Sequence, residues 1–334
     1  MYAASLAKSG NYIFVGASSN AGTSGAEIWR CDTSGTCSDT TGWTRLAGDY
    51  LNSSWGVYGL NGVVSMTTTG GKLYAGTGDD QAAATSNGNA TVWEYNGTSW
   101  TMIGGQGINS SWAYAHPTST AATYRSVTSM TGYNGTLIAG IGGGTNGDAE
   151  VWSWNGSAWT KIGGDGSGSG GQSWAAGTKR SVTSMTVIGS TLYVGLQGTA
   201  AGDGEMWTCD LAVSCTTTAG WTFRGGDATG AGGQSWNNTT FESVWSMAVR
   251  GTNLYVGLGS SAGDAEVWTC DTGSSCAQTA GWTKLGGDTV NSSWANSTYE
   301  EVTALTWYRG ELYAGLGAST GDAASLRRGQ CAGR

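Results

Sequence analysis

Short apolar runs separated by glycine, asparagine and serine turns recur along the whole chain. A methionine or leucine before the first turn of each unit lies seven residues ahead of the aliphatic residue that opens the next run. These pairs are Leu6 and Ile13, Met66 and Leu73, Met130 and Leu137, Met185 and Leu192, Met247 and Leu254, and Leu305 and Leu312. A tryptophan ends each full unit, at Trp55, Trp112, Trp174, Trp236 and Trp294. The pattern therefore predicts one structural unit that begins six times and is completed five times.

Each unit contains four β-type runs bounded by turn residues. In the fourth unit they lie at 182–186, 192–196, 205–209 and 221–224, where apolar residues mix with Tyr, Thr and Gly. Because no helical periodicity is present, the sequence predicts an all-β fold. The leading architecture is a single β-propeller of about six four-stranded blades, the sixth incomplete. The alternative is an open β-solenoid, whose coils usually repeat in about 20 to 30 residues, roughly half the period seen here.

The whole chain, 1–334, is predicted to form one domain, because units of this length do not bury a core alone. The expected repeats, first to sixth, are 1–55, 56–112, 113–174, 175–236, 237–294 and the truncated 295–334.

The sixth repeat ends early. Leu326 stands where the fifth repeat has Trp268, and no sequence for a fourth strand follows it. The third strand near 323–326 is therefore expected to have an unpaired edge, which proteins either blunt or use. Arg327 and Arg328 would blunt it. Alternatively, a strand from another copy or another protein adds to it, which makes this edge, with Cys331, the predicted assembly point of an oligomer or fibre.

Six of the seven cysteines form three pairs of identical spacing, each two residues after the tryptophan of the third strand. The pairs are Cys31 and Cys37, Cys209 and Cys215, and Cys270 and Cys276. They occur only where the loop to the fourth strand is long, so a local disulfide would restrain that loop. Zinc is the rival interpretation, but the spacing differs from a zinc knuckle and no histidine accompanies it. Disulfides predict an extracellular or cell-surface location.

The composition and charge of the chain restrict the classes of partner that it is expected to bind. The net charge of −8 and the scarcity of Lys and Arg argue against nucleic acid. No apolar run approaches the roughly 18 residues of a membrane span, so no membrane insertion is expected. Eighteen tryptophans supply apolar surface for burial, which indicates a folded chain despite 59 glycines. Those on the third and fourth strands are expected to be core.

The order Leu-Tyr-Val-Gly-Leu, Glu-Met-Trp, a turn, and then Trp-Thr resembles the kelch repeat of β-propellers. Tyr193, Gly195, Trp207 and Trp221 stand at matching places. The Asn-Gly-x-x-Trp-Thr turns resemble the Asp-boxes of sialidase-type propellers, and the repeats rich in Trp and Gly resemble tachylectin-like lectins. Over nearly the whole chain the sequence is similar to the repetitive propeller arrays of large bacterial surface proteins. The resemblance implies a propeller fold and a surface or secreted location.

The connections between repeats carry the candidate ligand-binding residues. Three of them end in Asn-Ser-Ser-Trp and two in Gly-Gly-Gln-Ser-Trp. An indole beside amides, hydroxyls and a carboxylate suits a sugar, because the ring face stacks and the polar groups bind hydroxyls. The alternative is that each Trp plugs the gap between blades. The candidate residues are Asp49, Asn52, Trp55, Asn109, Trp112, Asp165, Gln172, Trp174, Asp227, Gln234, Trp236, Asp288, Asn291 and Trp294.

Acidic residues precede the third strand in Gly-Asp turns, at Asp148, Asp203, Asp264 and Asp322, with Glu150, Glu205 and Glu266 on the strand. Calcium is conceivable there, but turn formation by Asp is favoured because no Asp-x-Asp-x-Asp loop exists. His116 is the single imidazole, without a nucleophile elbow or a metal-binding His pair. No catalytic residue, metal or cofactor is therefore expected.

Together these features predict an extracellular, non-catalytic binding or adhesion propeller that binds carbohydrate multivalently through its connections. Its expected partners are glycans or surface proteins. The alternative function is a structural or assembly module, with protein–protein contact and no small-molecule ligand.

Overall fold

The computed structural model describes most of the chain and shows an all-β protein of antiparallel strands and short 3-10 turns. The described residues are 2–19, 25–55, 60–78, 90–105, 107–112, 124–143, 149–164, 174, 178–200, 202–226, 236, 240–274, 276, 281–287, 290–294, 299–317 and 324–327. Across these ranges no helix is long and apolar enough to cross a membrane. The all-β prediction is confirmed.

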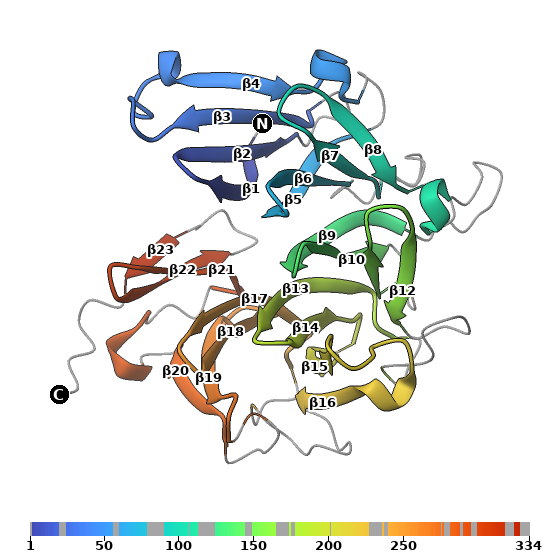
Figure 1. Cartoon of the computed structure of the whole chain (residues 1–334). Coiled ribbons are helices and arrows are strands. Elements are labelled where there is room, and N and C mark those ends of the chain that lie inside the picture. Colours follow the sequence, from blue (N-terminus) through green and yellow to red (C-terminus); the bar gives the residue numbers. More distant parts are fainter. Residues whose placement is uncertain are drawn as a thin grey trace. The chain divides into compact units, whose positions relative to one another are not determined.

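The chain forms two compact units, Met1–Gly171 and Gln172–Arg334. In the first unit each repeat is a four-stranded antiparallel meander (Figure 1). Its strands are β1 (Tyr2–Ser9), β2 (Tyr12–Ser18), β3 (Glu27–Asp32), β4 (Trp43–Ala47), β5 (Gly62–Thr69), β6 (Lys72–Gly78), β7 (Val92–Tyr95), β8 (Trp100–Gly104), β9 (Tyr124–Tyr133), β10 (Thr136–Gly143), β11 (Glu150–Trp154) and β12 (Trp159–Gly163). The 3-10 turns η1 (Thr40–Gly42), η2 (Leu51–Ser53) and η3 (Ile108–Ser110) lie before or after fourth strands.

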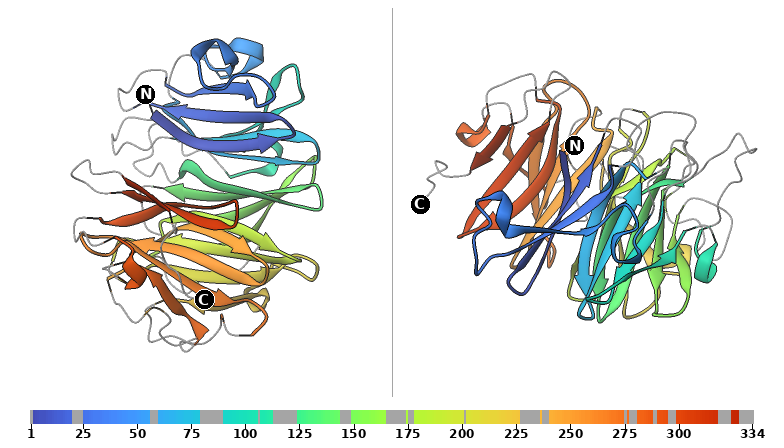
Figure 2. Two further views of the ribbon diagram at one scale, coloured as in Figure 1. Left: turned by 90° about the vertical axis from the view of Figure 1, so that its left-hand side faces the viewer. Right: turned by 90° about the horizontal axis from the view of Figure 1, so that it is seen from above.

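Among its described residues the second unit contains two four-stranded antiparallel meanders and one of three strands. Figure 2 shows the strands from two further sides. The strands are β13 (Ser181–Ile188), β14 (Thr191–Gln197), β15 (Glu205–Asp210), β16 (Trp221–Gly225), β17 (Ser243–Arg250), β18 (Asn253–Gly259), β19 (Glu266–Asp271), β20 (Thr283–Gly286), β21 (Glu301–Tyr308), β22 (Glu311–Gly317) and β23 (Ala324–Arg327), with turns η4 (Thr218–Gly220) and η6 (Val290–Ser292). The structure describes no fourth strand in the sixth repeat; residues 328–334 lie outside the described ranges.

Two-residue turns join the first and second strands of the repeats. The central pairs Gly70–Gly71, Asn134–Gly135 and Arg309–Gly310 have positive φ at both residues. This backbone matches the twist of the flanking strands and favours Gly and Asn, which occupy five of these six positions; Arg309 is the exception. The turns fix the register that brings each methionine or leucine of the first strand opposite the second strand.

Consecutive repeats meet at a serine, a valine and a glycine. Ser65 Oγ on β5 donates to the Val127 carbonyl of the third repeat at 2.5 Å, and Gly76 lies opposite Ser65. A Cβ on Gly76 would lie 2.8 Å from Val127 Cβ. The same Ser-to-Val hydrogen bond joins Ser5 to Val63, Ser184 to Val244 and Ser246 to Val302, at 2.6, 2.7 and 2.8 Å. Glycine is therefore required wherever the next repeat packs closely.

The sixth repeat keeps the glycine, Gly315, but lacks the serine. Ala304 replaces the serine, and a Cβ on Gly315 would meet nothing nearer than Ala304 Cβ at 3.4 Å. This repeat therefore keeps the strand pattern without the close contact that follows in the others.

The tryptophans that end the first four connections pack against tryptophans of the following repeat. Trp55 lies with its ring centroid 5.5 Å from Trp93 and 5.8 Å from Trp100. Trp112 has the same relation to Trp152 and Trp159, at 5.8 and 5.3 Å. In the second unit Trp174 contacts Trp221 at 5.3 Å, and Trp236 contacts Trp282 at 5.0 Å. These edge-to-face or tilted aromatic contacts form much of the core between repeats.

The three cysteine pairs have their sulfur atoms at bonding distance, 1.96 Å for Cys31–Cys37, 1.95 Å for Cys209–Cys215 and 2.10 Å for Cys270–Cys276. This agrees with the predicted disulfides. Each closes the long loop between a third and a fourth strand, and the Cys37 and Cys215 carbonyls accept the indole N–H of Trp43 and Trp221. Cys331 lies outside the described residues.

Two glycines at equivalent positions, Gly257 of the fifth repeat and Gly315 of the sixth, test the packing between repeats. Gly257→Ala would place a Cβ 2.6 Å from the Val302 carbonyl oxygen, so we expect the free energy of unfolding to fall by about 1–3 kcal/mol. Gly315→Ala, at the equivalent place in the sixth repeat, should cost nothing and stabilise by up to about 1 kcal/mol, since alanine restricts the unfolded chain. Urea denaturation of both variants measures the difference. Equal losses would show that the glycines serve strand geometry alone.

Candidate functional site

The Asn-Ser-Ser-Trp connections fold identically in the first, second and fifth repeats. The asparagine has a left-handed backbone, with φ of 53°, 52° and 55° at Asn52, Asn109 and Asn291, and its amide turns back to the fourth strand of its own repeat. In the first repeat Asn52 Nδ2 donates to the Leu46 carbonyl at 3.1 Å, and the Gly48 N–H donates to Ser54 Oγ at 2.9 Å. Trp55 Nε1 donates to the Ala26 carbonyl at 2.6 Å.

The other two connections repeat these bonds. Asn109 donates to the Ile103 carbonyl and Asn291 to the Leu285 carbonyl, at 3.0 Å each. Ser111 accepts from the Gly105 N–H and Ser293 from the Gly287 N–H, at 2.9 Å each. Trp112 donates to the Ala90 carbonyl at 2.8 Å and Trp294 to the Ala265 carbonyl at 2.9 Å. The amide, the hydroxyl and the indole N–H thus all form hydrogen bonds within the protein, and these bonds fix the conformation of the connection.

The predicted sugar-binding indoles are buried. Trp55, Trp112, Trp174, Trp236 and Trp294 expose 4%, 3%, 0%, 1% and 8% of their surface. Asp49 forms an ion pair with Arg45 at 3.1 Å. Stacking of a sugar requires an open ring face, so the geometry of these residues favours the plug interpretation, and carbohydrate binding stays a prediction. Asp165, Gln172, Asp227, Gln234 and Asp288 lie outside the described residues.

A second recurring group joins the third and fourth strands through a carboxylate. Glu27, Glu150, Glu205 and Glu266 accept the indole N–H of the tryptophan two residues later, at 2.6 to 2.8 Å. In three repeats a cation from the fourth strand binds the same glutamate: Arg45 with Glu27 at 2.8 Å, Lys161 with Glu150 at 2.6 Å, and Lys284 with Glu266. In the second repeat Thr91 accepts the Trp93 N–H, and Met102 stands at the cation position. Carboxylate and cation therefore occur together or are both absent.

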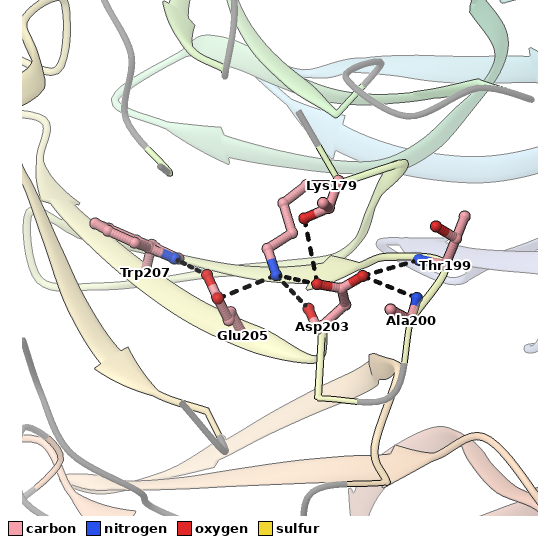
Figure 3. A network of polar contacts seen from close by, with 7 residues as sticks. Lys179, Thr199, Ala200, Asp203, Glu205 and Trp207 are labelled. Atoms are coloured by element: carbon pink, nitrogen blue, oxygen red, sulfur yellow. Dashed lines mark hydrogen bonds and ion pairs between the residues drawn. The ribbon is translucent and has the colours of Figure 1, made fainter. Parts of the chain in front are cut away.

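In the fourth repeat the cation that pairs with the third-strand glutamate comes from outside the fourth strand (Figure 3). Phe223 occupies the cation position and packs edge-to-face on Trp207, with centroids 5.5 Å apart. Lys179, from the segment before β13, supplies the positive charge. Its Nζ lies 3.0 Å from Glu205 Oε1 and 2.9 Å from Asp203 Oδ1. Its side chain is only 4% exposed, so one buried ammonium forms ion pairs with both carboxylates.

Asp203 also organises the turn before β15. Its Oδ2 accepts the backbone N–H of Ala200 at 2.9 Å and of Thr199 at 3.1 Å. Burial alone would raise the pKa of Asp203, but the hydrogen bonds from Lys179 and Ala200, with the charge of Lys179, hold that pKa below its ordinary value. The carboxylate is therefore ionised at neutral pH, and the turn-forming role agrees with the sequence interpretation.

The neighbouring repeat shows a related turn, in which Asp264 Oδ2 accepts from Ser260 Oγ at 2.9 Å. In the part of the chain that the structure describes, no group of three or more His, Cys, Asp or Glu side chains could hold a metal ion. Where Asp203 and Glu205 come together, Lys179 already provides the cation. Asp148, Asp322 and His116 lie outside the described residues.

Lys179 was not among the residues singled out in the sequence. The sequence contains one indication of such a residue. Phe223 stands where other repeats have the fourth-strand cation that pairs with the third-strand glutamate, so a basic residue outside the fourth strand is needed to pair with Glu205. The spacing of the repeats does not reveal which of the nearby basic residues would supply it.

No protein-family model and no curated protein matches the sequence. Among solved structures, one described as a structural and mechanistic study of two prolyl endopeptidases is similar with a TM-score of 0.52 and 12% identity. The match covers 97% of this chain and 41% of that chain. A computationally designed protein, Ika8, matches 97% of this chain and 95% of its own at 12% identity, with a TM-score of 0.38. The likeness to the endopeptidase structure concerns the fold alone.

Replacing Lys179 tests the buried network. Lys179→Met leaves two buried carboxylates without a counterion, so the free energy of unfolding at pH 7 should fall by about 3 kcal/mol. In the wild type the lowered pKa of Asp203 stabilises the protein above its unfolded-state pKa, and this stabilisation is lost as pH falls through the folded-state pKa. In the variant burial raises that pKa, so the deficit should shrink on acidification.

Two further variants complete this test by urea denaturation at pH 7 and pH 4. Adding Phe223→Lys to Lys179→Met restores the fourth-strand cation and should recover roughly 1 kcal/mol or more. Lys72→Met, which breaks the more exposed pair with Glu94, should cost no more than about 1 kcal/mol. A Lys179 variant that matches the Lys72 variant would show that the network contributes little.

Proposed function

We propose that this chain is a non-catalytic binding and assembly module of an extracellular or cell-surface protein, built as a β-propeller of six repeats. The recurring meanders and the endopeptidase likeness support the architecture, although neither describes a closed ring. The three cysteine pairs support an oxidising location. In the described repeats, the carboxylates, cations and connection amides are used in internal contacts, which supports a scaffold in preference to a catalyst.

The observation that carries the proposal is the edge of the sixth repeat. β23 pairs with β22, in register Gly315 to Ser325 and Ala314 to Leu326. No described strand pairs with its other side, whereas every other third strand pairs on both sides. A free strand edge presents backbone donors and acceptors to which an extended segment of another polypeptide adds. The module therefore binds protein through this edge, and self-assembly is its simplest form.

Carbohydrate binding, the other function predicted from the sequence, is placed second. The described connection tryptophans bury their rings, and in the Asn-Ser-Ser-Trp connections the amide, hydroxyl and indole N–H bind the protein internally.

Proline substitutions test the edge. Neighbouring residues of a strand direct their N–H groups to opposite sides. Of the two substitutions Ser325→Pro and Leu326→Pro, one therefore removes a donor from the free edge of β23, which is the outward proline, and the other removes a hydrogen bond to β22. The outward proline should keep the wild-type melting temperature, because edge strands tolerate it, and should weaken self-association at least about tenfold in sedimentation velocity. A Cys331→Ser background removes any intermolecular disulfide. Assembly that is unchanged in both variants, or a wild type that never associates, contradicts self-assembly through β23.

A further inference from the structure

The sequence Tyr-Asn-Gly-Thr occurs twice in the first unit, at 95–98 and at 133–136. An asparagine before glycine is prone to lose its side-chain amide, because glycine has no Cβ to shield the backbone nitrogen that attacks it. Since the two segments are identical, their asparagines should react at similar rates in an unfolded chain. The structure places them in turns of different kinds.

The first copy lies in the turn between β7 and β8, where the backbone holds the side chain of Asn96. Its Oδ1 accepts the N–H of Thr98 and of Ser99 at 2.9 Å each. The Asn96 N–H donates to the Ser99 carbonyl at 3.3 Å, and the Tyr95 hydroxyl donates to the Gly97 carbonyl at 2.8 Å. This is an Asx-turn, in which the carboxamide faces the N–H groups further along the chain. The carboxamide must leave these bonds before its carbon can meet the Gly97 nitrogen.

The turn between β11 and β12 holds Asn155, which also precedes a glycine, in the same way. Its Oδ1 accepts the Ser157 N–H at 2.9 Å, the Ser157 hydroxyl at 3.0 Å and the Ala158 N–H at 2.9 Å. A further described asparagine before glycine, Asn61, is only 7% exposed, and its carbonyl accepts the Ser19 N–H at 2.9 Å. Hydrogen bonds or burial therefore restrain each of these side chains.

The second copy of the segment forms the tip of the β9–β10 hairpin. Asn134 and Gly135 are its two central residues, with φ of 47° and 79°. The strand pairing ends at Tyr133 and Thr136, so the Gly135 N–H takes no part in it. Asn134 is exposed, as Asn96 is, but among the described residues no group forms a hydrogen bond with its carboxamide. Exposure is thus common to both copies, and the hydrogen bonds distinguish them.

We propose that the folded protein deamidates spontaneously at Asn134 and is protected at Asn96 and Asn155. The Gly135 nitrogen attacks Asn134 Cγ and forms a C–N bond. The bond between Cγ and Nδ2 breaks, and ammonia leaves with the proton of the Gly135 N–H. The resulting cyclic imide is opened by water at one of its two carbonyls, which gives aspartate or isoaspartate. Water is the single co-reactant, and no group is oxidised or reduced.

The modification changes both the charge and the length of this turn. Either product has a carboxylate in place of a neutral amide, and isoaspartate adds a methylene to the main chain, which then runs through Cβ. A two-residue turn fixes the register of its strands, so the longer turn should loosen β9 and β10. The turn of the second repeat lies beside it, because a Cβ on Gly70 would be 3.7 Å from the Gly135 carbonyl oxygen. The isoaspartate form should therefore have a lower melting temperature than the unmodified chain.

Peptide mapping by tandem mass spectrometry, after incubation of the folded chain at neutral pH, tests the proposal. Aspartate and isoaspartate should form at position 134 at least about tenfold faster than at Asn96 or Asn155, which must first break two or more hydrogen bonds. In the reduced chain unfolded in urea, the two Tyr-Asn-Gly-Thr segments should react at similar rates. Equal rates at Asn134 and Asn96 in the folded chain would overturn the proposal. So would a folded chain that keeps Asn134 intact for as long as it keeps Asn96.

A matched pair of variants locates the reaction independently. Asn134→Gly introduces the residue that the second repeat has at this position, Gly70, so it should keep the wild-type melting temperature. It should also abolish the acidic species that ion-exchange chromatography detects as the described sites of the wild type age. Asn96→Gly makes the same change in the protected copy and should leave those species in place. Acidic species from the peptide around 96 that exceed those from the peptide around 134 would assign the reaction to the wrong turn and contradict the inference.

Discussion

Burial of the indoles that end the first four connections holds consecutive repeats together. A tryptophan buries about 150–250 Å², which corresponds to roughly 4–6 kcal/mol of favourable transfer free energy, whereas a single hydrogen bond contributes about 1 kcal/mol. Burial of Trp55 or Trp112 against two tryptophans of the next repeat therefore stabilises the contact more than any one of its hydrogen bonds. The bonds from Asn, Ser and the indole N–H fix the direction of the ring, so that the next fourth strand finds a defined partner.

Backbone carbonyls of the fourth strand, those of Leu46 and Ile103, add a specific hydrogen bond to this packing, because each accepts the indole N–H of a tryptophan from the next repeat. Because Leu46 and Ile103 lie outside the strand pairing, their carbonyls accept one donor from their own connection and one from the following repeat. The close Gly–Val contact and the Ser hydrogen bond lie on the first and second strands of the same repeats. Two contacts at different strands thus set the spacing of neighbours. The sixth repeat has Ala304 in place of the serine that makes this hydrogen bond in the repeats described above.

The sequence was sufficient to predict the strands and the cysteine pairs, because both depend on spacing along the chain. It was not sufficient for the direction of side chains. The Asn-Ser-Ser-Trp motif looked like a polar ligand site, but the left-handed backbone at Asn52 turns the amide to the Leu46 carbonyl. The substitution of Phe223 for a cation was visible in the repeats, yet Lys179 compensates from a segment 44 residues earlier, which no period reveals.

Hydrogen exchange of the indole N–H groups tests the central claim most directly. In protein labelled with 15N-tryptophan and moved to D2O, the signals of Trp55, Trp112, Trp100 and Trp159 should exchange slowest, because their N–H groups are bonded to carbonyls in buried sites. The half-buried indoles that donate to glutamates, such as Trp29 and Trp152, should exchange faster. Connection indoles that exchange as fast as these, or whose signals shift on addition of simple sugars, would contradict the account of a locked contact between repeats.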